Sequence, residues 1–347
     1  MTCNQQRERW VLNSRPSGAF KVSDAKLITD VLDICKPSPG EVVVKMETLG
    51  LDAFLRTMLD AEAFHGGEAL RGAIIALETS PRNSNSLTPI FMRLATLVAA
   101  VDIGKTLPAF GIGTIVASGV NATFTPGTVV MGMFGATNYA VVTPGEMGPF
   151  PTLPIVPPEL GLGLLSLTTG ITAHVGIYNV LGSPKKDQTV VISAAAGAVG
   201  TVATQLAKRT GAKVIGVAGG PKKRAFLEDD LGVLAVDYKA GDVKGQLDKL
   251  APDGIDFFFD GAGGDILDEV LARINYNSRI VICGAASQYS GNLNVGSVQG
   301  PSNYLKLAEK DSTMKGFVVL NYMWRIPFAM IDLIYLWSTS KIALRER

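Results

Sequence analysis

The stretch from Thr189 to Gly200 (TVVISAAAGAVG) constrains this chain most, because a short apolar run passes directly into small residues. Its first five residues are mostly β-branched and apolar, the composition of a fully buried strand. Gly197 would let the backbone approach a pyrophosphate, and Gly200 would let the following helix pack closely on the strand. A strand, a glycine turn and a helix N-terminus form the layout that binds a dinucleotide. The pattern reads A-x-G-x-x-G, with Ala195 at the usual first glycine, so a plain strand–helix turn of small residues is the alternative.

The residues after the next strand-like run, Lys213 to Ala218, indicate which dinucleotide would bind. A site that prefers NAD places Asp or Glu near the end of this strand, where it binds the ribose 2′-hydroxyl. The chain instead continues Gly219-Gly220-Pro221-Lys222-Lys223-Arg224. Three cations suit a 2′-phosphate, which a carboxylate would repel. Cations at a helix N-terminus oppose the helix dipole, so a solvated basic helix start does not explain them. We therefore expect NADPH rather than NADH.

Strand and helix patterns alternate from residue 189 onward, which predicts a doubly wound parallel sheet of the Rossmann type. We expect this nucleotide-binding domain to span residues 151–330, after a proline-rich linker at 149–158. Helical patterns are expected over 160–180, 199–210, 222–230 and 264–274. The strand-like runs are 189–193, 213–218, 233–237, 255–260, 278–284 and 314–320.

Residues 1–150 have the pattern of a mostly β domain, because short strand-like runs alternate with glycine and proline turns. These runs predict a partly open barrel that would carry the substrate. Residues 61–107 fit this pattern poorly, although residues 89–101 could form a helix. Within this stretch, residues 66–103 are expected to be an insertion without any part of the nucleotide site. The strand-like runs are 10–12, 41–45, 111–117, 128–131 and 138–142.

The composition narrows the classes of protein. The formal net charge of +1 suggests no nucleic-acid partner, and the two longest apolar stretches are interrupted by charges and proline, so we expect no membrane span. Three cysteines, Cys3, Cys35 and Cys283, are few, far apart and odd in number, so we expect no disulfide framework, a reducing compartment and a cytoplasmic location. With only His65 and His174 besides, no metal site is expected.

Several motifs together resemble one family, the zinc-independent medium-chain dehydrogenases/reductases with a GroES-like β domain. Within that family the chain is similar to the group of leukotriene B4 dehydrogenase, prostaglandin reductase and alkenal double-bond reductase. The matching segments span most of the chain, and they are WVLNSRP from Trp10, LDAFLR from Leu51, GIGT from Gly111, SAAAGAVG from Ser193, DYK from Asp237, CGAASQY from Cys283 and MKGFVV from Met314.

The resemblance implies NADPH-dependent reduction of an activated carbon–carbon double bond, as in enals and enones, by a homodimer. It implies that Lys223 and Tyr238 contact the 2′-phosphate beside Gly219, that a later loop flanks the nicotinamide, and that Phe54 contacts the substrate. The implied cofactor residues are Gly197, Ala198, Val199, Gly200, Gly219, Lys223, Tyr238, Cys283, Gly284, Ser287, Gln288, Tyr289, Phe317, Val318 and Val319.

The sequence departs from the family pattern at four places. Phe54 stands where a tyrosine is frequent, and Gly261 replaces an asparagine that bonds the cofactor. Residues 66–103 are roughly two dozen residues longer than the family's equivalent, a length that marks a functional loop or disorder. Residues 331–347 read as the start of a return segment that lacks the family's closing strand, which puts activity in doubt.

Hydride addition to the β-carbon of an enone produces an enolate that needs a hydrogen-bond donor. Tyr289, just after a strand of the doubly wound sheet, is our first candidate for this catalytic donor, and Tyr322 is the second. Either ring could instead merely pack beside the cofactor. A quinone oxidoreductase on the same fold, and an NADPH-binding protein without turnover, are the alternative functions.

Overall fold

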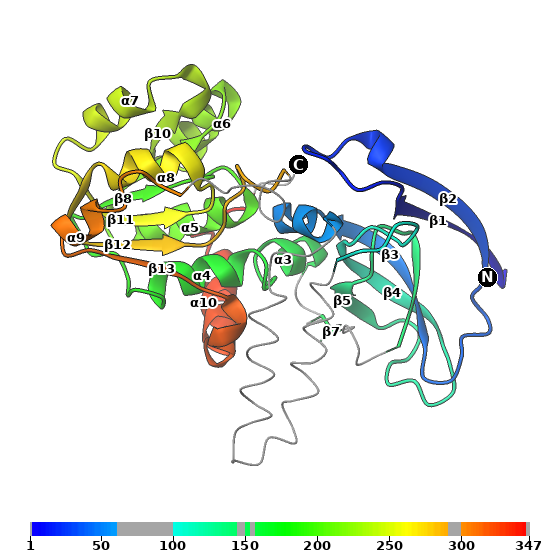
Figure 1. The fold of residues 1–347 in the computed structure, drawn as a ribbon. Helices are drawn as coiled ribbons and strands as arrows, with labels where there is room; N and C mark the ends of the chain where they lie inside the picture. The colour runs from blue at the N-terminus through cyan, green and yellow to red at the C-terminus, as the bar shows by residue number, and fades with distance from the viewer. Residues whose placement is uncertain (1, 61–99, 144–149, 153–156, 291–299, 345–347) are drawn as a thin grey trace, which may run out of the picture. The chain divides into compact units, whose positions relative to one another are not determined.

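The computed structural model describes residues 2–60, 100–143, 150–152, 157–290 and 300–344 (Figure 1). The insertion expected at 66–103, the helix expected at 89–101 and much of the expected linker lie outside these residues. The chain divides into two compact units. The first is Met1–Leu162 with Tyr289–Ser297, and the second is Gly163–Gln288 with Val298–Arg347.

The second unit contains a six-stranded sheet in the order β10-β9-β8-β11-β12-β13. Every neighbouring pair is parallel, which confirms the predicted Rossmann-type sheet. The strands are β8 (Thr189–Ile192), β9 (Lys213–Ala218), β10 (Leu234–Asp237), β11 (Ile255–Asp260), β12 (Ile274–Ile282) and β13 (Thr313–Gly316). The last strand ends before the predicted 314–320 run does, because the chain turns into the 3-10 helix η5 (Val319–Arg325).

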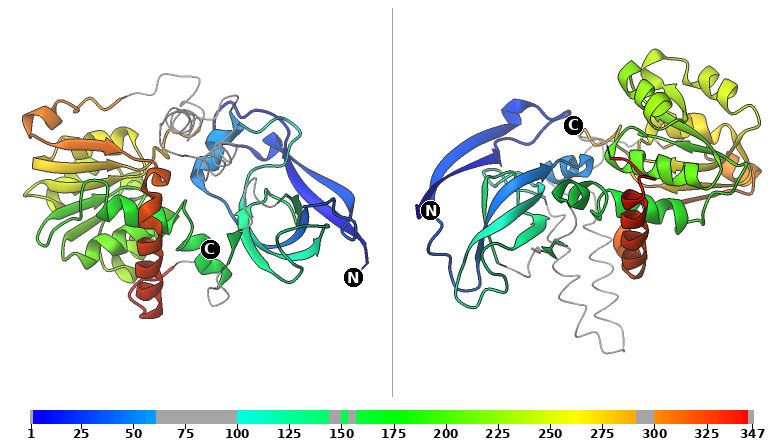
Figure 2. Two further views of the ribbon diagram at one scale, coloured as in Figure 1. Left: turned by 90° about the horizontal axis from the view of Figure 1, so that it is seen from below. Right: turned by 180° about the vertical axis from the view of Figure 1, so that it is seen from behind.

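Helices cover both faces of this sheet (Figure 1). Helix α4 packs against both α5 and α10, and Figure 2 shows α10 lying beside α4. The helices of the second unit are α4 (Gly170–Tyr178), α5 (Ala198–Arg209), α6 (Pro221–Ala225), α7 (Val243–Leu250), α8 (Gly264–Leu271), α9 (Lys306–Glu309) and α10 (Ile326–Ser338). Helix α3 (Pro158–Gly163) lies almost entirely in the first unit, whose main segment ends at Leu162. Shorter turns are the π-helix η3 (Phe226–Asp230) and the 3-10 helix η4 (Tyr238–Ala240).

Three consecutive phenylalanines in β11 show why both faces of the sheet must be covered. Side chains alternate across a strand, so Phe258 points to the face opposite Phe257 and Phe259. Phe258 belongs to the core cluster with Leu247 of α7 and Leu271 of α8. All three rings are buried, which is the pattern of a strand enclosed by helices on both sides.

The first unit holds a five-stranded antiparallel sheet in the order β6-β3-β4-β5-β7, as expected for the β-rich domain. Its core is formed by buried side chains that include Val44, Ile115 and Val130. The 3-10 helix η2 (Ala53–Leu59) follows β3 along the chain. The strands are β3 (Val42–Gly50), β4 (Phe110–Ser118), β5 (Val129–Met133), β6 (Tyr139–Val142) and β7 (Phe150–Pro151).

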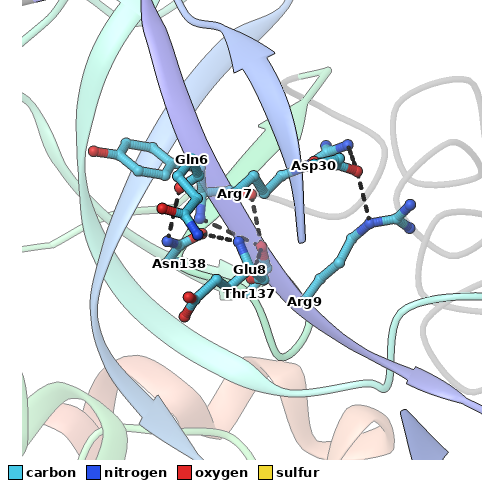
Figure 3. Close-up of polar contacts among 8 residues, drawn as sticks. Gln6, Arg7, Glu8, Arg9, Asp30, Thr137 and Asn138 are labelled. Carbon is cyan, nitrogen blue, oxygen red and sulfur yellow. Dashed lines mark hydrogen bonds and ion pairs between the residues drawn. The ribbon is translucent and has the colours of Figure 1, made fainter. Parts of the chain in front are cut away.

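The strands β1 (Asn4–Leu12) and β2 (Ala25–Asp33) form a separate antiparallel hairpin that precedes β3 along the chain. The short 3-10 turn η1 (Val22–Asp24) lies directly before β2. Figure 3 shows how polar contacts fasten it. Arg7 donates twice to the Asp30 carboxylate, at 2.7 and 2.8 Å, and this bond holds the Asp30 pKa below its ordinary value. Asn138 accepts from the Glu8 N–H at 2.8 Å, so β1 is also tied to the residue before β6.

The hairpin corrects our expectation that the cysteines would stay unpaired. Cys3 and Cys35 form a disulfide just beyond the last paired residues of β1 and β2. Their Cα atoms lie 5.0 Å apart because the Ile34 N–H donates to the Cys3 carbonyl and brings the two chain ends together. The strand β2 was not predicted, so nothing in the sequence placed these two cysteines side by side.

Candidate functional site

The strand order of the second unit creates one position where the chain reverses its direction across the sheet. From β8 the chain proceeds to β9 and β10, and it then returns to β11 on the other side of β8. In doubly wound sheets the ligand binds at this switch point, beyond the carboxyl ends of the strands. We therefore expect the segments that follow β8 and β11 to border the ligand-binding site.

The segment after β8 has the geometry of a phosphate-binding turn. Helix α5 begins at Ala198, and its N-cap residue Gly197 is exposed. No side chain in the described part of the chain caps this end, so among these residues the first N–H groups of the helix remain available to an anion. A Cβ on Gly200 would collide with the Ala194 carbonyl oxygen, which explains the glycine there. The predicted residues Gly197, Ala198, Val199 and Gly200 thus lie together at one helix end.

Ala195 stands in place of the usual first glycine, and its backbone does not need the conformational freedom of a glycine. It is buried, and its N–H donates to the Val217 carbonyl of β9 at 3.1 Å. The left-handed conformation falls instead on Ala194, whose φ is 50°. The departure from G-x-G-x-x-G therefore leaves the turn intact.

The segment after β9 brings Gly219 against the ring of Tyr238. A Cβ built on Gly219 would lie 2.5 Å from the Tyr238 Cζ atom. The α6 segment begins after Gly220, whose φ of 93° requires glycine, and it carries the exposed Lys222 and the partly exposed Lys223. Gly219, Lys223 and Tyr238 thus all follow the carboxyl ends of the neighbouring strands β9 and β10.

One carboxylate at this place was missed by the sequence reasoning. Asp237 ends β10 opposite Ala218 of β9, and its Oδ1 atom accepts from the Gly220 N–H at 2.7 Å and the Lys239 N–H at 2.9 Å. The bond from Gly220 is the main reason that the pKa of Asp237 lies below its ordinary value. The Asp237 carboxylate therefore supports the glycine turn, and only the sheet order reveals this contact, because the two residues are 17 positions apart in the sequence.

The loop after β12 carries the residues expected near the nicotinamide. Ser287 donates to the Ala262 carbonyl at 2.6 Å, so this loop is joined to the segment after β11. Burial raises the pKa of the Cys283 thiol to about 12, which leaves it without nucleophilic thiolate at neutral pH. Gly284 donates its N–H to the Asp260 carbonyl, and Gln288 donates its N–H to the Ala285 carbonyl.

The segment after β13 supplies the remaining predicted residues of the second unit. The Phe317 and Tyr322 rings meet edge to face with centroids 6.2 Å apart. Val318 is the N-cap residue of η5, and Val319 is its first residue. All predicted cofactor residues thus follow the carboxyl ends of strands in one sheet, and all except Tyr289 belong to the second unit.

Tyr289 and Phe54 belong to the first unit instead. Tyr289 is buried, and Phe54 lies in η2 with its ring centroid 6.3 Å from that of Phe110. The two candidate donors are therefore divided, with Tyr289 in one unit and Tyr322 in the other.

Candidate metal ligands gather at one place among the described residues. Ligand atoms of Cys3, Asp33 and Cys35 lie within 4.8 Å of one another, but both cysteines are in the disulfide. His174 is buried, its Nε2 atom lies 3.2 Å from the Asp332 carboxylate, and burial lowers its pKa. Within the described ranges, we find no helix of the length and apolarity that crossing a membrane requires.

A doubly wound parallel sheet with a glycine turn at its switch point, in a chain that also contains an antiparallel β domain, is typical of the class of dinucleotide-dependent oxidoreductases. Comparison with known proteins agrees. Residues 198–334 match the family model described as "Zinc-binding dehydrogenase". An NADP-dependent oxidoreductase of Bacillus subtilis is 31% identical over 329 residues, covering 93% of this chain and 83% of the relative.

A 2-alkenal reductase (NADP(+)-dependent) of Nicotiana tabacum is 36% identical over 231 residues, which cover 65% of this chain and 64% of the relative. Among solved structures, CurA of Vibrio vulnificus in complex with NADPH superposes with a TM-score of 0.76 at 28% identity, covering 98% of this chain and 90% of that chain. The chain belongs to the medium-chain dehydrogenases/reductases, in the zinc-independent group of alkenal and prostaglandin reductases.

Proposed function

We propose that the protein is an NADPH-dependent reductase of the carbon–carbon double bond in α,β-unsaturated aldehydes or ketones. The observation that carries this proposal is the grouping of an uncapped helix N-terminus, a basic segment and Tyr238 along one edge of the sheet. The names of related proteins support the reaction: one is an NADP(+)-dependent 2-alkenal reductase, and another is an NADPH-dependent curcumin reductase of Escherichia coli.

The residues of the second unit fit NADPH in three places. Gly197 to Gly200 would hold the pyrophosphate at the start of α5, where free N–H groups and the helix dipole favour an anion. Lys223 and Tyr238 would hold the 2′-phosphate. The loops at 283–288 and 317–319 would flank the nicotinamide, because both follow strands that end at the same edge of the sheet.

The bound cofactor supplies a hydride, and the protein's own contribution is to the substrate carbonyl. As hydride adds to the β-carbon, negative charge moves to the carbonyl oxygen, and a proton from water would then add to the α-carbon to give the saturated product. A neutral phenol can donate a hydrogen bond to that oxygen, and loss of one buried donor of this kind typically costs about 10²–10³ in rate. Tyr289 would be this donor, and Tyr322, whose ring lies against Phe317, is the second candidate.

Two of the departures from the family pattern bear on the substrate and cofactor. Phe54 keeps an aromatic surface beside Phe110 but offers no hydroxyl, so substrate binding there would be apolar. Gly261 removes an amide that would bond the cofactor, which lowers the expected affinity. A quinone oxidoreductase would need the same cofactor site but no specific proton donor, so it remains the second function to be tested.

Measuring NADPH oxidation with a small enal, with a quinone and with neither substrate tests the proposal directly. We expect turnover with the enal, formation of the saturated aldehyde and much slower turnover with NADH. Turnover with the quinone alone would replace the proposal by its alternative. Tight NADPH binding without turnover of either substrate would identify a binding protein instead.

A further inference from the structure

Two buried polar side chains meet at the switch point of the sheet, and neither is among the predicted site residues. Ser193 directly follows β8, and Asp260 is the last residue of β11, the strand beside it. The Ser193 Oγ atom donates to the Asp260 Oδ1 atom at 2.6 Å. Both side chains are essentially without exposed surface. A buried carboxyl is costly, so its retention at this point requires a reason.

The Ser193 hydroxyl uses its full hydrogen-bonding capacity. It donates to Asp260 and accepts from the Gly261 N–H at 2.8 Å and the Ala262 N–H at 3.0 Å. A hydroxyl offers one donor and two acceptor positions, so all three are occupied. Ser193 therefore joins the phosphate-binding turn, which begins at the next residue, to the segment that follows β11.

Asp260 extends the same network to a third segment. Its Oδ1 atom accepts from the Ala262 and Gly263 N–H groups, each at 3.0 Å. Its backbone carbonyl accepts from the Cys283 N–H at 2.7 Å and the Gly284 N–H at 3.1 Å. Burial raises the pKa of this carboxyl, and the bonds from Ser193, Gly263 and Ala262 oppose that shift.

The segment held by Asp260 has a conformation that depends on this support. Gly263 and Gly264 have φ values of 67° and 59°, in the left-handed region. A Cβ on Gly263 would lie 3.2 Å from the Ala285 Cβ, so the segment packs tightly against the loop after β12. The Ala286 N–H also donates to the Gly261 carbonyl at 3.1 Å. A shift of the Asp260 carboxyl would thus move both segments together.

We propose that Ser193 and Asp260 are positioning residues for the cofactor. Their hydrogen bonds fix the backbone segments that would contact the pyrophosphate and the nicotinamide. The backbone near the proposed 2′-phosphate site is fixed separately, by the bond from the Gly220 N–H to Asp237. This inference rests on the proposed binding of NADPH. The segments that the pair positions are 194–197, 261–264 and 283–288.

The test replaces Ser193 by alanine and compares the variant with Ser278→Ala. Ser278 is an equally buried serine of the same sheet, whose Oγ donates to the Ile255 carbonyl at the amino end of β11. Dissociation constants are measured for the full chain with NADPH and with adenosine 2′-monophosphate, well below the melting temperature of each variant. The second ligand has the 2′-phosphate but neither pyrophosphate nor nicotinamide.

We expect Ser193→Ala to weaken NADPH binding about tenfold, because the Gly261 N–H loses its acceptor and the linked segments loosen. Binding of adenosine 2′-monophosphate should stay within about twofold, and Ser278→Ala should lower the melting temperature without changing either constant. Unchanged NADPH affinity in Ser193→Ala, or an equal loss for both ligands, would overturn the positioning role. Failure of the unmodified protein to bind NADPH would instead refute the proposed function, so the two failures are distinguishable.

Discussion

Replacing Gly219 by alanine tests the adenosine end of the site with a single methyl group. Gly219 has no left-handed backbone conformation, so alanine can adopt its dihedral angles. The new Cβ would lie 2.5 Å from the Tyr238 Cζ and 2.7 Å from its Oη, far inside van der Waals contact. The Tyr238 ring is 43% exposed and can swing outward, so we expect it to move by about 1 Å and the fold to lose under about 1 kcal/mol.

The movement should nevertheless weaken cofactor binding, because a hydrogen bond depends steeply on distance. A bond from the Tyr238 hydroxyl to a 2′-phosphate is charge-assisted and is worth about 1.5–3 kcal/mol. Its loss corresponds to a factor of about 10 to 150 in the dissociation constant for NADPH. NADH has no 2′-phosphate, so its weaker binding should change by less than about twofold.

The measurement is a fluorescence titration of the unmodified protein, Gly219→Ala and Tyr238→Phe with both cofactors, together with melting temperatures. Gly300→Ala is the matched control, since a Cβ there meets no atom of the described residues within 4 Å. An equal loss of NADPH and NADH affinity would show that the methyl group disturbs the backbone rather than Tyr238. A fall in melting temperature above about 5 °C would refute the assumption that the ring yields.

Three further changes test other parts of the molecule. Lys223→Ala should weaken NADPH binding about tenfold or more and leave NADH binding nearly unchanged, as measured by titration; equal losses would remove Lys223 from the phosphate site. Tyr289→Phe should lower kcat and kcat/KM together for a small enal while NADPH affinity is kept; a loss below about threefold would favour Tyr322 or a water molecule. His174→Gln should make stability less dependent on pH: burial lowers the pKa of His174, so the unfolded chain binds a proton below about pH 6.5 that the folded chain resists, and stability is lost as the pH falls. Melting temperatures at pH 7 and pH 5 check this, and an unchanged pH dependence in the variant would contradict it.

The sheet was predictable because its strands are buried on both faces. Runs such as Val190 to Ile192 and Phe257 to Phe259 have no polar alternation, and glycine turns separate them from helices. The turn at Gly197 was predictable because the spacing of its glycines reflects a local steric requirement. Local signals of this kind are contained within a dozen residues.

We predicted one helix over residues 160–180, but the structure has two, α3 and α4, because side-chain hydrogen bonds that composition does not reveal interrupt it. Between α3 and α4, Ser166 accepts from the Thr168 N–H and Thr169 bonds to the Gly163 carbonyl. Side chains of serine and threonine can replace backbone partners in this way and end a helix. Gly170 then permits the chain to pass close to the Leu164 carbonyl, which a Cβ would block.

The missed parts of the site depend on residues that are distant in the sequence. Ser193 and Asp260 are separated by 67 positions, and only the adjacency of β8 and β11 brings them together. Asp237 supports Gly220 because β10 lies beside β9, which no spacing in the sequence indicates. Sheet order had to be known before these contacts could be foreseen.

The disulfide between Cys3 and Cys35 closes residues 3–35 into a covalent ring that contains the whole N-terminal hairpin. A protease that cut the connection between β1 and β2, at residues 13–24, would open this ring without dividing the chain. The nicked molecule would keep its full mass under oxidising conditions and would release its first residues only when a thiol reductant is added. Covalent separation of β1 from the rest of the protein therefore requires two chemical steps, cleavage and reduction, and neither alone is sufficient.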